Sequence, residues 1–189
     1  MKKWIAILMT VAVLVSLIAC AAKDEPDPTQ NAAKYADSLE IMNLIWNNIP
    51  EDGKFSCFGG NQDEDATMDA PDDFDISDTD GMTYMLLIPE AEQKNIDNAA
   101  SLVHMMNANT FTGAVVRVNG ADVASVANAI KDNVMNNQFM CGFPDKLIVL
   151  TTGEYIIYAF GSEDTIDNFK AAVVQSVESV TQVCEESLI

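Results

Sequence analysis

The sequence predicts an α+β domain in which two hairpins form a four-stranded antiparallel sheet and amphipathic helices pack mainly on one face. Two pairs of segments rich in Val, Ile and Tyr, each pair separated by a short turn, predict the sheet; they lie within 101–118 and 147–160. Apolar residues that recur with helical spacing before, between and after these pairs predict the helices. Strands joined by hairpins run antiparallel, and the apolar stripe of each helix needs a sheet face to cover.

The first helix of the domain is predicted between residues 35 and 49. Its apolar stripe consists of Tyr35, Leu39, Met42, Trp46 and Ile49. Pro50 and Gly53 end it. An acidic loop is expected over 59–80, and the end of that loop, from Ser77 to Asp80, resembles a capped helix N-terminus. A short helix to about residue 87 follows from this cap, and a strand over 83–88 is the alternative.

The first predicted hairpin follows a short helix over 90–100. Its strands, 101–106 and 110–118, flank a turn formed by 107–109, where two Asn residues tolerate left-handed backbone. Asp122 then caps a helix. The apolar stripe of that helix is Val123, Val126, Ala127, Ile130 and Val134.

The second predicted hairpin joins strands 147–151 and 155–160 through a turn at 152–154. Ser162 opens the last helix, and the carboxylates of Glu163 and Asp164 favour its N-terminal dipole. The buried stripe of this helix is expected to be Ile166, Phe169, Val173, Val177, Val180 and Cys184. Phe169, Val173 and Val177 should pack on the sheet together with Ile156 or Ile157.

The first twenty residues predict export. A basic start, Met1 to Lys3, precedes 16 uncharged residues, whereas a membrane-spanning helix needs roughly 20. We therefore interpret residues 1–19 as a signal peptide. The end of this segment, Leu17-Ile18-Ala19-Cys20, resembles the lipobox of bacterial lipoproteins. That resemblance implies cleavage before Cys20 and a diacylglyceryl group on its thiol.

The predicted localisation is therefore the extracytoplasmic face of the cell membrane, reached through a lipid on Cys20. Two acyl chains hold a protein stably on a membrane. Residues 20–32 are polar and contain two prolines, so they are interpreted as a flexible tether, and 33–189 as a single domain. The membrane is the expected partner of the lipid, and an envelope protein or a small ligand is the expected partner of the domain.

The charge of the chain excludes nucleic acid as a partner. The formal charge is −19, and loss of Lys2 and Lys3 with the leader would make it −21. Nucleic acids require a basic surface, and anionic lipid headgroups also repel an acidic one. The lipid would therefore do the anchoring.

The remaining cysteines are Cys57, Cys141 and Cys184. Three thiols allow one internal disulfide and leave one thiol over. Export permits a disulfide without requiring one, and buried free thiols that pack as small hydrophobic groups are the alternative. The sequence leaves both possibilities open.

Several segments resemble a known protein family. They are 69–71, 77–80, 104–112 and 140–146, with the sequences DAP, SDTD, HMMNANTFT and MCGFPDK. They resemble uncharacterised lipoproteins of Gram-positive gut bacteria, often labelled bacteriocin transport accessory proteins, from about 59 to 169. The label implies a thioredoxin-like redox helper. This sequence departs from that chemistry because it contains no C-x-x-C motif.

No catalytic or cofactor-binding residue is predicted, and no cofactor. Calcium prefers carboxylate oxygens, so the metal candidates are Asp73, Asp75, Asp78 and Asp80. An EF-hand register fails, because its first and last positions would be Ile76 and Leu87. His104 is the only histidine, so it is interpreted as structural, and the methionines are interpreted as core residues.

Three functions remain. The leading hypothesis is a non-enzymatic binding or accessory module of the cell envelope. The first alternative is a thiol or redox accessory protein linked to bacteriocin or peptide export. The second is a calcium-dependent adhesion or sensing module.

Overall fold

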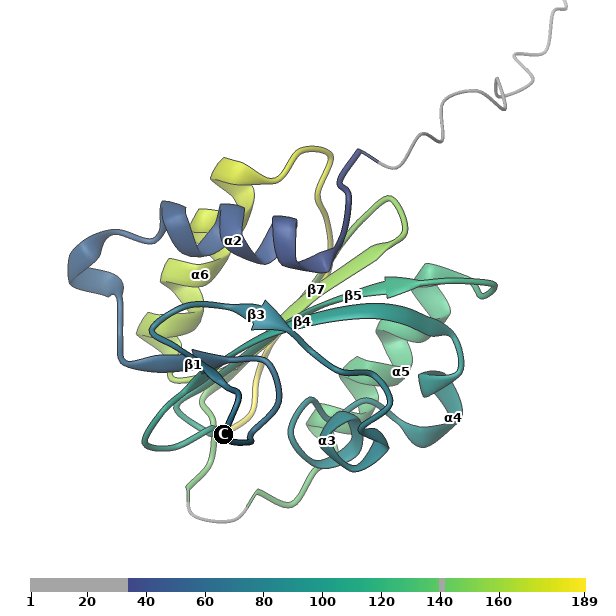
Figure 1. Cartoon of the computed structure of the whole chain (residues 1–189), viewed down its shortest axis with the longest axis horizontal. Helices are drawn as coiled ribbons and strands as arrows, with labels where there is room; N and C mark the ends of the chain where they lie inside the picture. The colour runs from purple at the N-terminus through teal and green to yellow at the C-terminus, as the bar shows by residue number, and fades with distance from the viewer. Residues whose placement is uncertain (1–33, 140–141) are drawn as a thin grey trace, which may run out of the picture. The chain divides into compact units, whose positions relative to one another are not determined.

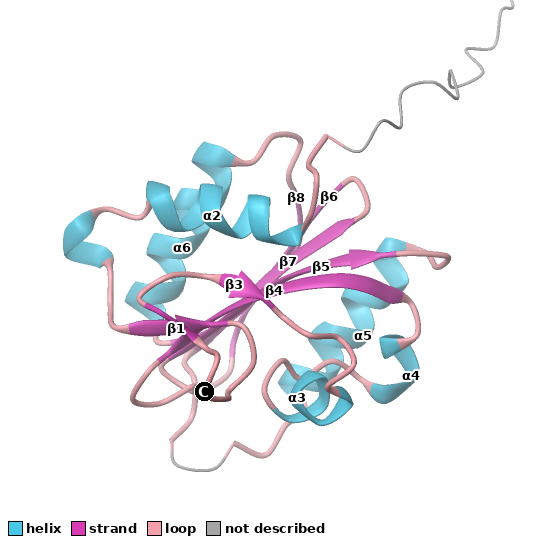
Figure 2. Cartoon of the chain, viewed as in Figure 1, coloured by secondary structure: helices cyan, strands magenta, loops and turns pink. Residues whose placement is uncertain are grey.

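The fold is built on one open sheet in which every strand pair is antiparallel (Figures 1 and 2). The computed structural model describes residues 34–139 and 142–189. Within these ranges the sheet has eight strands, in the order β2-β1-β4-β5-β7-β6-β8, and β3 also pairs with β4. The strands are β1 (Cys57–Gly59), β2 (Thr67–Met68), β3 (Asp72–Asp73), β4 (Ile96–His104), β5 (Phe111–Val118), β6 (Lys146–Thr152), β7 (Tyr155–Gly161) and β8 (Thr181–Ser187).

Helices cover both faces of this sheet, as Figure 1 shows. α2 (Ser38–Asn48) and α6 (Glu163–Ser176) lie on one face, and α5 (Val123–Met135) lies on the other with the short α3 (Thr79–Tyr84) and α4 (Glu90–Gln93). A 3-10 turn, Glu51–Gly53, follows α2. The prediction of an antiparallel sheet with helices is confirmed. The predictions of four strands and of helices mainly on one face are wrong, because β5 and β7 bury residues on both faces.

Both predicted hairpins are confirmed, with one strand longer than expected. β4 pairs with β5 through Val103 and Thr112 across the predicted turn, and Thr152 pairs with Tyr155 across the second turn. The predicted helix over 90–100 is wrong after residue 93. β4 begins at Ile96 because its first residues pair with the end of β5, and this tertiary pairing overrides local helix propensity.

The predicted last helix ends earlier than expected. It stops at Ser176, with Val177 as the C-cap, and Ser179 adopts the left-handed backbone with φ +56°. The chain then returns along β6 as the edge strand β8, in which Cys184 lies opposite Val149. Val177 and Cys184 are buried as predicted, but Cys184 is buried by a strand and not by the helix.

The predicted acidic loop contains more regular structure than expected. β1 ends in it, and the two-residue strands β2 and β3 pair with β1 and β4. α3 begins at its end, as predicted, but stops at Tyr84 and not near residue 87, and the alternative of a strand over 83–88 is wrong. Asp78 caps α3 by accepting from the amide of Gly81 at 2.8 Å. Asp122 caps α5 as predicted, by accepting from the amide of Ser125 at 2.9 Å.

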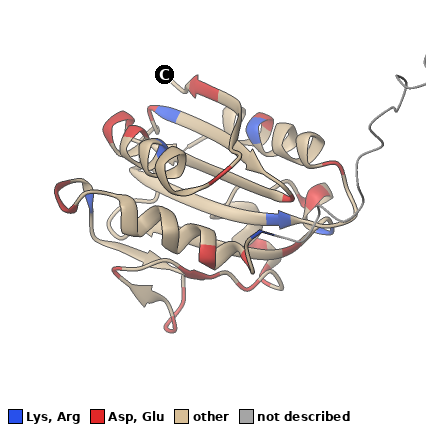
Figure 3. Ribbon diagram, turned by 90° about the horizontal axis from the view of Figure 1, so that it is seen from above, with Lys and Arg blue, Asp and Glu red and all other residues tan. Residues whose placement is uncertain are grey.

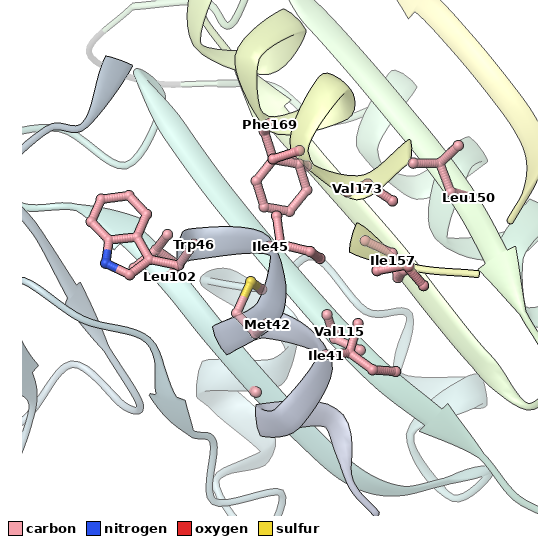
Figure 4. Packing of buried hydrophobic residues seen from close by; sticks show 14 of the residues in the cluster. Ile41, Met42, Ile45, Trp46, Leu102, Val115, Leu150, Ile157, Phe169 and Val173 are labelled. Atoms are coloured by element: carbon pink, nitrogen blue, oxygen red, sulfur yellow. The ribbon is translucent and has the colours of Figure 1, made fainter. Parts of the chain in front are cut away.

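The first hydrophobic core fills the space between the sheet and the helices α2 and α6 (Figure 4). Phe169 and Val173 are fully buried there, as predicted. Ile157 faces this core, whereas Ile156 faces the opposite one, because successive strand residues point to opposite faces. Trp46 and Met42 of α2 pack in the same core.

The second hydrophobic core lies between the other sheet face and α5, α3 and the segment after α3. Tyr158 is fully buried in it, and its hydroxyl donates to the carbonyl oxygen of Leu86 at 2.8 Å. Burial raises the pKa of the Tyr158 phenol well above its ordinary value. This hydrogen bond holds the segment after α3 against β7.

Residues Ala33–Ile189 form one compact unit. Among the described residues, no helix is both long and apolar enough to cross a membrane. The predicted signal peptide, tether and lipidated Cys20 lie outside the described residues.

Candidate functional site

The candidate site is a groove at the sheet end formed by the β4–β5 turn. Its main cavity has a volume of about 390 Å³, which falls in the range of small-ligand pockets. A second cavity, of about 100 Å³, shares Met85 and Ala108 with it. We call the two together the Tyr84 groove. The main cavity is lined by Thr83, Tyr84, Met85, Leu87, Ala108, Asn109, Thr112, Asn133, Asn137, Gln138, Phe139 and Phe160.

Two side-chain amides fix the walls of the groove. Asn133 on α5 donates to the carbonyl oxygen of Leu87 at 2.8 Å, and this bond ties α5 to the segment after α3. Leu87 has a left-handed backbone with φ +54°, which is unusual for leucine. Asn109 donates to the carbonyl oxygen of Gly142 at 2.8 Å. Both Asn133 and Leu87 line the main cavity, so their bond connects two of its walls.

Exposed apolar side chains gather at the rim of the groove. Tyr84 is 78% exposed and Met106 is 82% exposed, although both are large. Met105 lines the smaller cavity beside Met106 and is 41% exposed. Exposed apolar residues that cluster at a concave surface mark binding sites more often than isolated ones do.

The groove differs from the rest of the domain in its charge. Acidic residues are spread over the loops, helices and edge strands of the domain, and basic residues are few (Figure 3). Several of those basic residues are paired with carboxylates, as Lys146 is with Asp167 and Glu185. Among the described residues, neither cavity of the Tyr84 groove is lined by Asp, Glu, Lys or Arg.

Two of the four metal candidates, Asp75 and Asp78, are held in local hydrogen bonds. Asp75 accepts from the amide of Ser77, and hydrogen bonds from Ser77 lower the pKa of Asp75. Asp78 caps α3 and also accepts from the side chain of Asn61 at 3.0 Å. Partial burial, with nearby Asp37 and Asp72, raises the pKa of Asp73, and Asp80 is exposed in the first turn of α3. The described residues include no group of three His, Cys, Asp or Glu side chains placed to hold a metal ion.

A variant with Asp72, Asp73, Asp75 and Asp78 changed to Asn is expected to fold. It should be as stable as the parent at low ionic strength, or slightly more stable, because repulsion between carboxylates is relieved. Asn accepts hydrogen bonds as Asp does and caps helices equally well. Thermal unfolding at low ionic strength measures this. The matched control is Asp78→Ala, which removes the cap and should cost about 1 kcal/mol. Failure of the Asn variant to fold would show that these acids have ionic partners essential to the fold.

The structure brings Cys57 and His104 together, a conceivable pairing that no sequence motif indicated. The two residues lie opposite each other where β1 pairs with β4. The Nδ1 atom of His104 accepts from the amides of Met106 and Asn107, and its ring stacks on Phe55 at 5.4 Å. Burial and the nearby Asp69 raise the pKa of the Cys57 thiol to about 12. This thiol is therefore protonated and unsuited to act as a nucleophile at neutral pH.

Cys184 is also buried, and burial together with Glu186 raises its pKa to about 11. Cys57 and Cys184 belong to different hydrophobic cores on opposite faces of the sheet and form no disulfide with each other. Cys141 lies outside the described residues.

The sequence reasoning missed the Tyr84 groove, because its residues come from α3, α5, β5, β7 and the β4–β5 turn. The one available signal was the density of side-chain amides from 107 to 109 and from 133 to 138. Comparison of the chain with models of known protein families, with curated proteins and with solved structures found no match.

Proposed function

We propose that this chain is a lipid-anchored, extracytoplasmic and non-enzymatic binding module of the cell envelope. The observation that carries the proposal is the leader that ends in Leu17-Ile18-Ala19-Cys20. A basic start, a short apolar segment and this terminal motif together specify export, and the motif supplies the thiol that receives the lipid.

The position of the groove supports a binding role. Tyr35, near the start of the described chain, accepts a hydrogen bond from Tyr155 through its carbonyl oxygen and one from the Glu178 amide through its hydroxyl. Tyr155 begins β7, whereas Phe160, near the other end of that strand, lines the groove. The described chain therefore begins at the sheet end opposite the groove.

The chemistry of the described cysteines favours binding over thiol catalysis. A thiol enzyme needs a cysteine whose pKa is lowered by a positive neighbour or a helix N-terminus. The pKa values of the Cys57 and Cys184 thiols are instead raised, by burial and by acidic neighbours. The domain thus offers a groove and no activated thiol among the residues described.

Changing Cys20 to Ser is expected to move the protein out of the membrane fraction or to leave the leader uncut. The physical reason is that serine cannot form the thioether that carries the diacylglyceryl group. Fractionation of cells that produce the full chain, followed by mass measurement of the mature N-terminus, tests this.

The matched control is Cys57→Ser, which removes a buried thiol from the domain and leaves the leader intact. The control should stay in the membrane fraction with normal processing. If the Cys20→Ser protein were processed normally and stayed on the membrane, the anchoring proposal would be wrong.

A further inference from the structure

We propose that the Tyr84 groove binds a neutral saccharide, an inference that rests on the proposed function as a binding module and names its ligand class. The first step is charge. A ligand phosphate or carboxylate is usually recognised by Arg or Lys, and an amine by a carboxylate. In the part of the chain that the structure describes, none of these side chains lines the groove, although the formal charge of the chain is −19. Its ligand is therefore uncharged.

The second step is hydrogen bonding. Asn137 and Gln138 line the main cavity, and within the described chain their side-chain amides make no hydrogen bond. An amide side chain both donates and accepts. A sugar hydroxyl also donates and accepts. Side-chain amides can therefore donate to, or accept from, the several hydroxyls of a sugar ring.

The third step is the aromatic surface. Tyr84 is 78% exposed, which leaves its ring available to a ligand. Phe139 also lines the cavity and is supported by Phe160, with ring centroids 5.6 Å apart. The C–H face of a sugar ring packs on the electron-rich face of an aromatic ring, while the hydroxyls at the sugar edge reach polar groups. Aromatic rings beside free amides provide both contacts.

The groove is less suited to an extended peptide. Peptides recognised in extended form commonly add a strand to an open sheet edge, and their main chain supplies the affinity. The main cavity of the groove lies over β5 and β7, which are interior strands paired on both sides. Its polar groups are side chains, and this favours a ligand that carries its own hydroxyls.

The experiment is calorimetric titration of the full-length protein, in a detergent without a sugar headgroup, with two matched disaccharides. N,N′-diacetylchitobiose is neutral, and deacetylated chitobiose is cationic. We expect the neutral sugar to bind more tightly than the cationic one. Tyr84→Ala and Gln138→Ala should each weaken that binding by about tenfold, because each removes a contact to the sugar. Val174→Ala is the matched control, since Val174 is exposed on α6 and lines neither cavity of the groove.

Several outcomes would overturn the inference. The first is absence of binding to the neutral sugar. The second is tighter binding of the cationic sugar, which would indicate attraction to the acidic surface alone. The third is neutral-sugar binding that Tyr84→Ala and Gln138→Ala leave unchanged, which would place the sugar elsewhere. Fractionation of the Cys20→Ser variant needs no ligand, so failure of the saccharide inference and failure of the anchoring proposal are distinguishable.

Discussion

Replacing Phe169 with alanine is expected to lower the free energy of unfolding by about 3–5 kcal/mol. Phe169 is fully buried on α6, and its ring packs against Phe111 of β5 with ring centroids 5.3 Å apart. Truncation removes a large apolar group from between the helix and the sheet, where α2 also closes the core (Figure 4). The surrounding side chains belong to regular elements and can refill the cavity only in part.

Chemical denaturation of parent and variant measures this loss, and the melting temperature should fall by roughly 6–20 °C. Val174→Ala on the same helix is the control: Val174 is 64% exposed, and its truncation should change stability by less than about 0.5 kcal/mol. A loss below about 1 kcal/mol for Phe169→Ala would contradict the assignment of this helix face to the core.

The elements that were predicted correctly are those whose start, end and apolar pattern are encoded by neighbouring residues. The two hairpins have turn residues between apolar strands. α5 has a capping Asp122 and α6 has two acids in its first turn, and each start is followed by a helical stripe. The strands that were missed depend on distant partners. β2 and β3 have two residues each and exist only through pairing with β1 and β4.

Strand β8 was missed for a different reason. The sequence pattern predicted that the apolar stripe of α6 continues, because the spacing of Val177, Val180 and Cys184 is helical. The left-handed backbone at Ser179 ends that register, and an exposed edge strand with two glutamates gives a weak strand pattern. The sequence did indicate that helices cover both sheet faces. The segment 155–160, YIIYAF, is continuously apolar and does not alternate, as is typical of a strand buried on both faces.

The candidate site was less accessible to sequence reasoning than the fold. Cys57 and His104 are 47 positions apart, and only the register between β1 and β4 brings them together. The metal candidates were proposed from acid density, but the local hydrogen bonds that hold Asp75 and Asp78 depend on Ser77, Gly81 and Asn61. Residue type indicates which groups can bind a ligand, whereas tertiary contacts decide which of them remain available.

Changing Gly59 to alanine is expected to cost about 3 kcal/mol or more, because the new methyl group would overlap backbone atoms. A Cβ at Gly59 would lie 2.1 Å from the amide nitrogen of Asp72, 2.4 Å from the carbonyl carbon of Pro71 and 2.6 Å from the carbonyl oxygen of Ala70. No side-chain rotation relieves such contacts. β1 and the segment that contains β3 would have to separate, although both pair with β4.

Gly153→Ala is the control that separates overlap from backbone preference. Gly153 lies in the β6–β7 turn with φ +56°, and no atom lies within 4 Å of the position of its added Cβ. Its cost should be about 1–2 kcal/mol, from the left-handed backbone alone. Hydrogen exchange should then place the damage of Gly59→Ala at the amides of 72–74, with faster exchange there than in β5 and β7. A Gly59→Ala protein as stable as Gly153→Ala, with protected amides at 72–74, would mean that this close approach is not required.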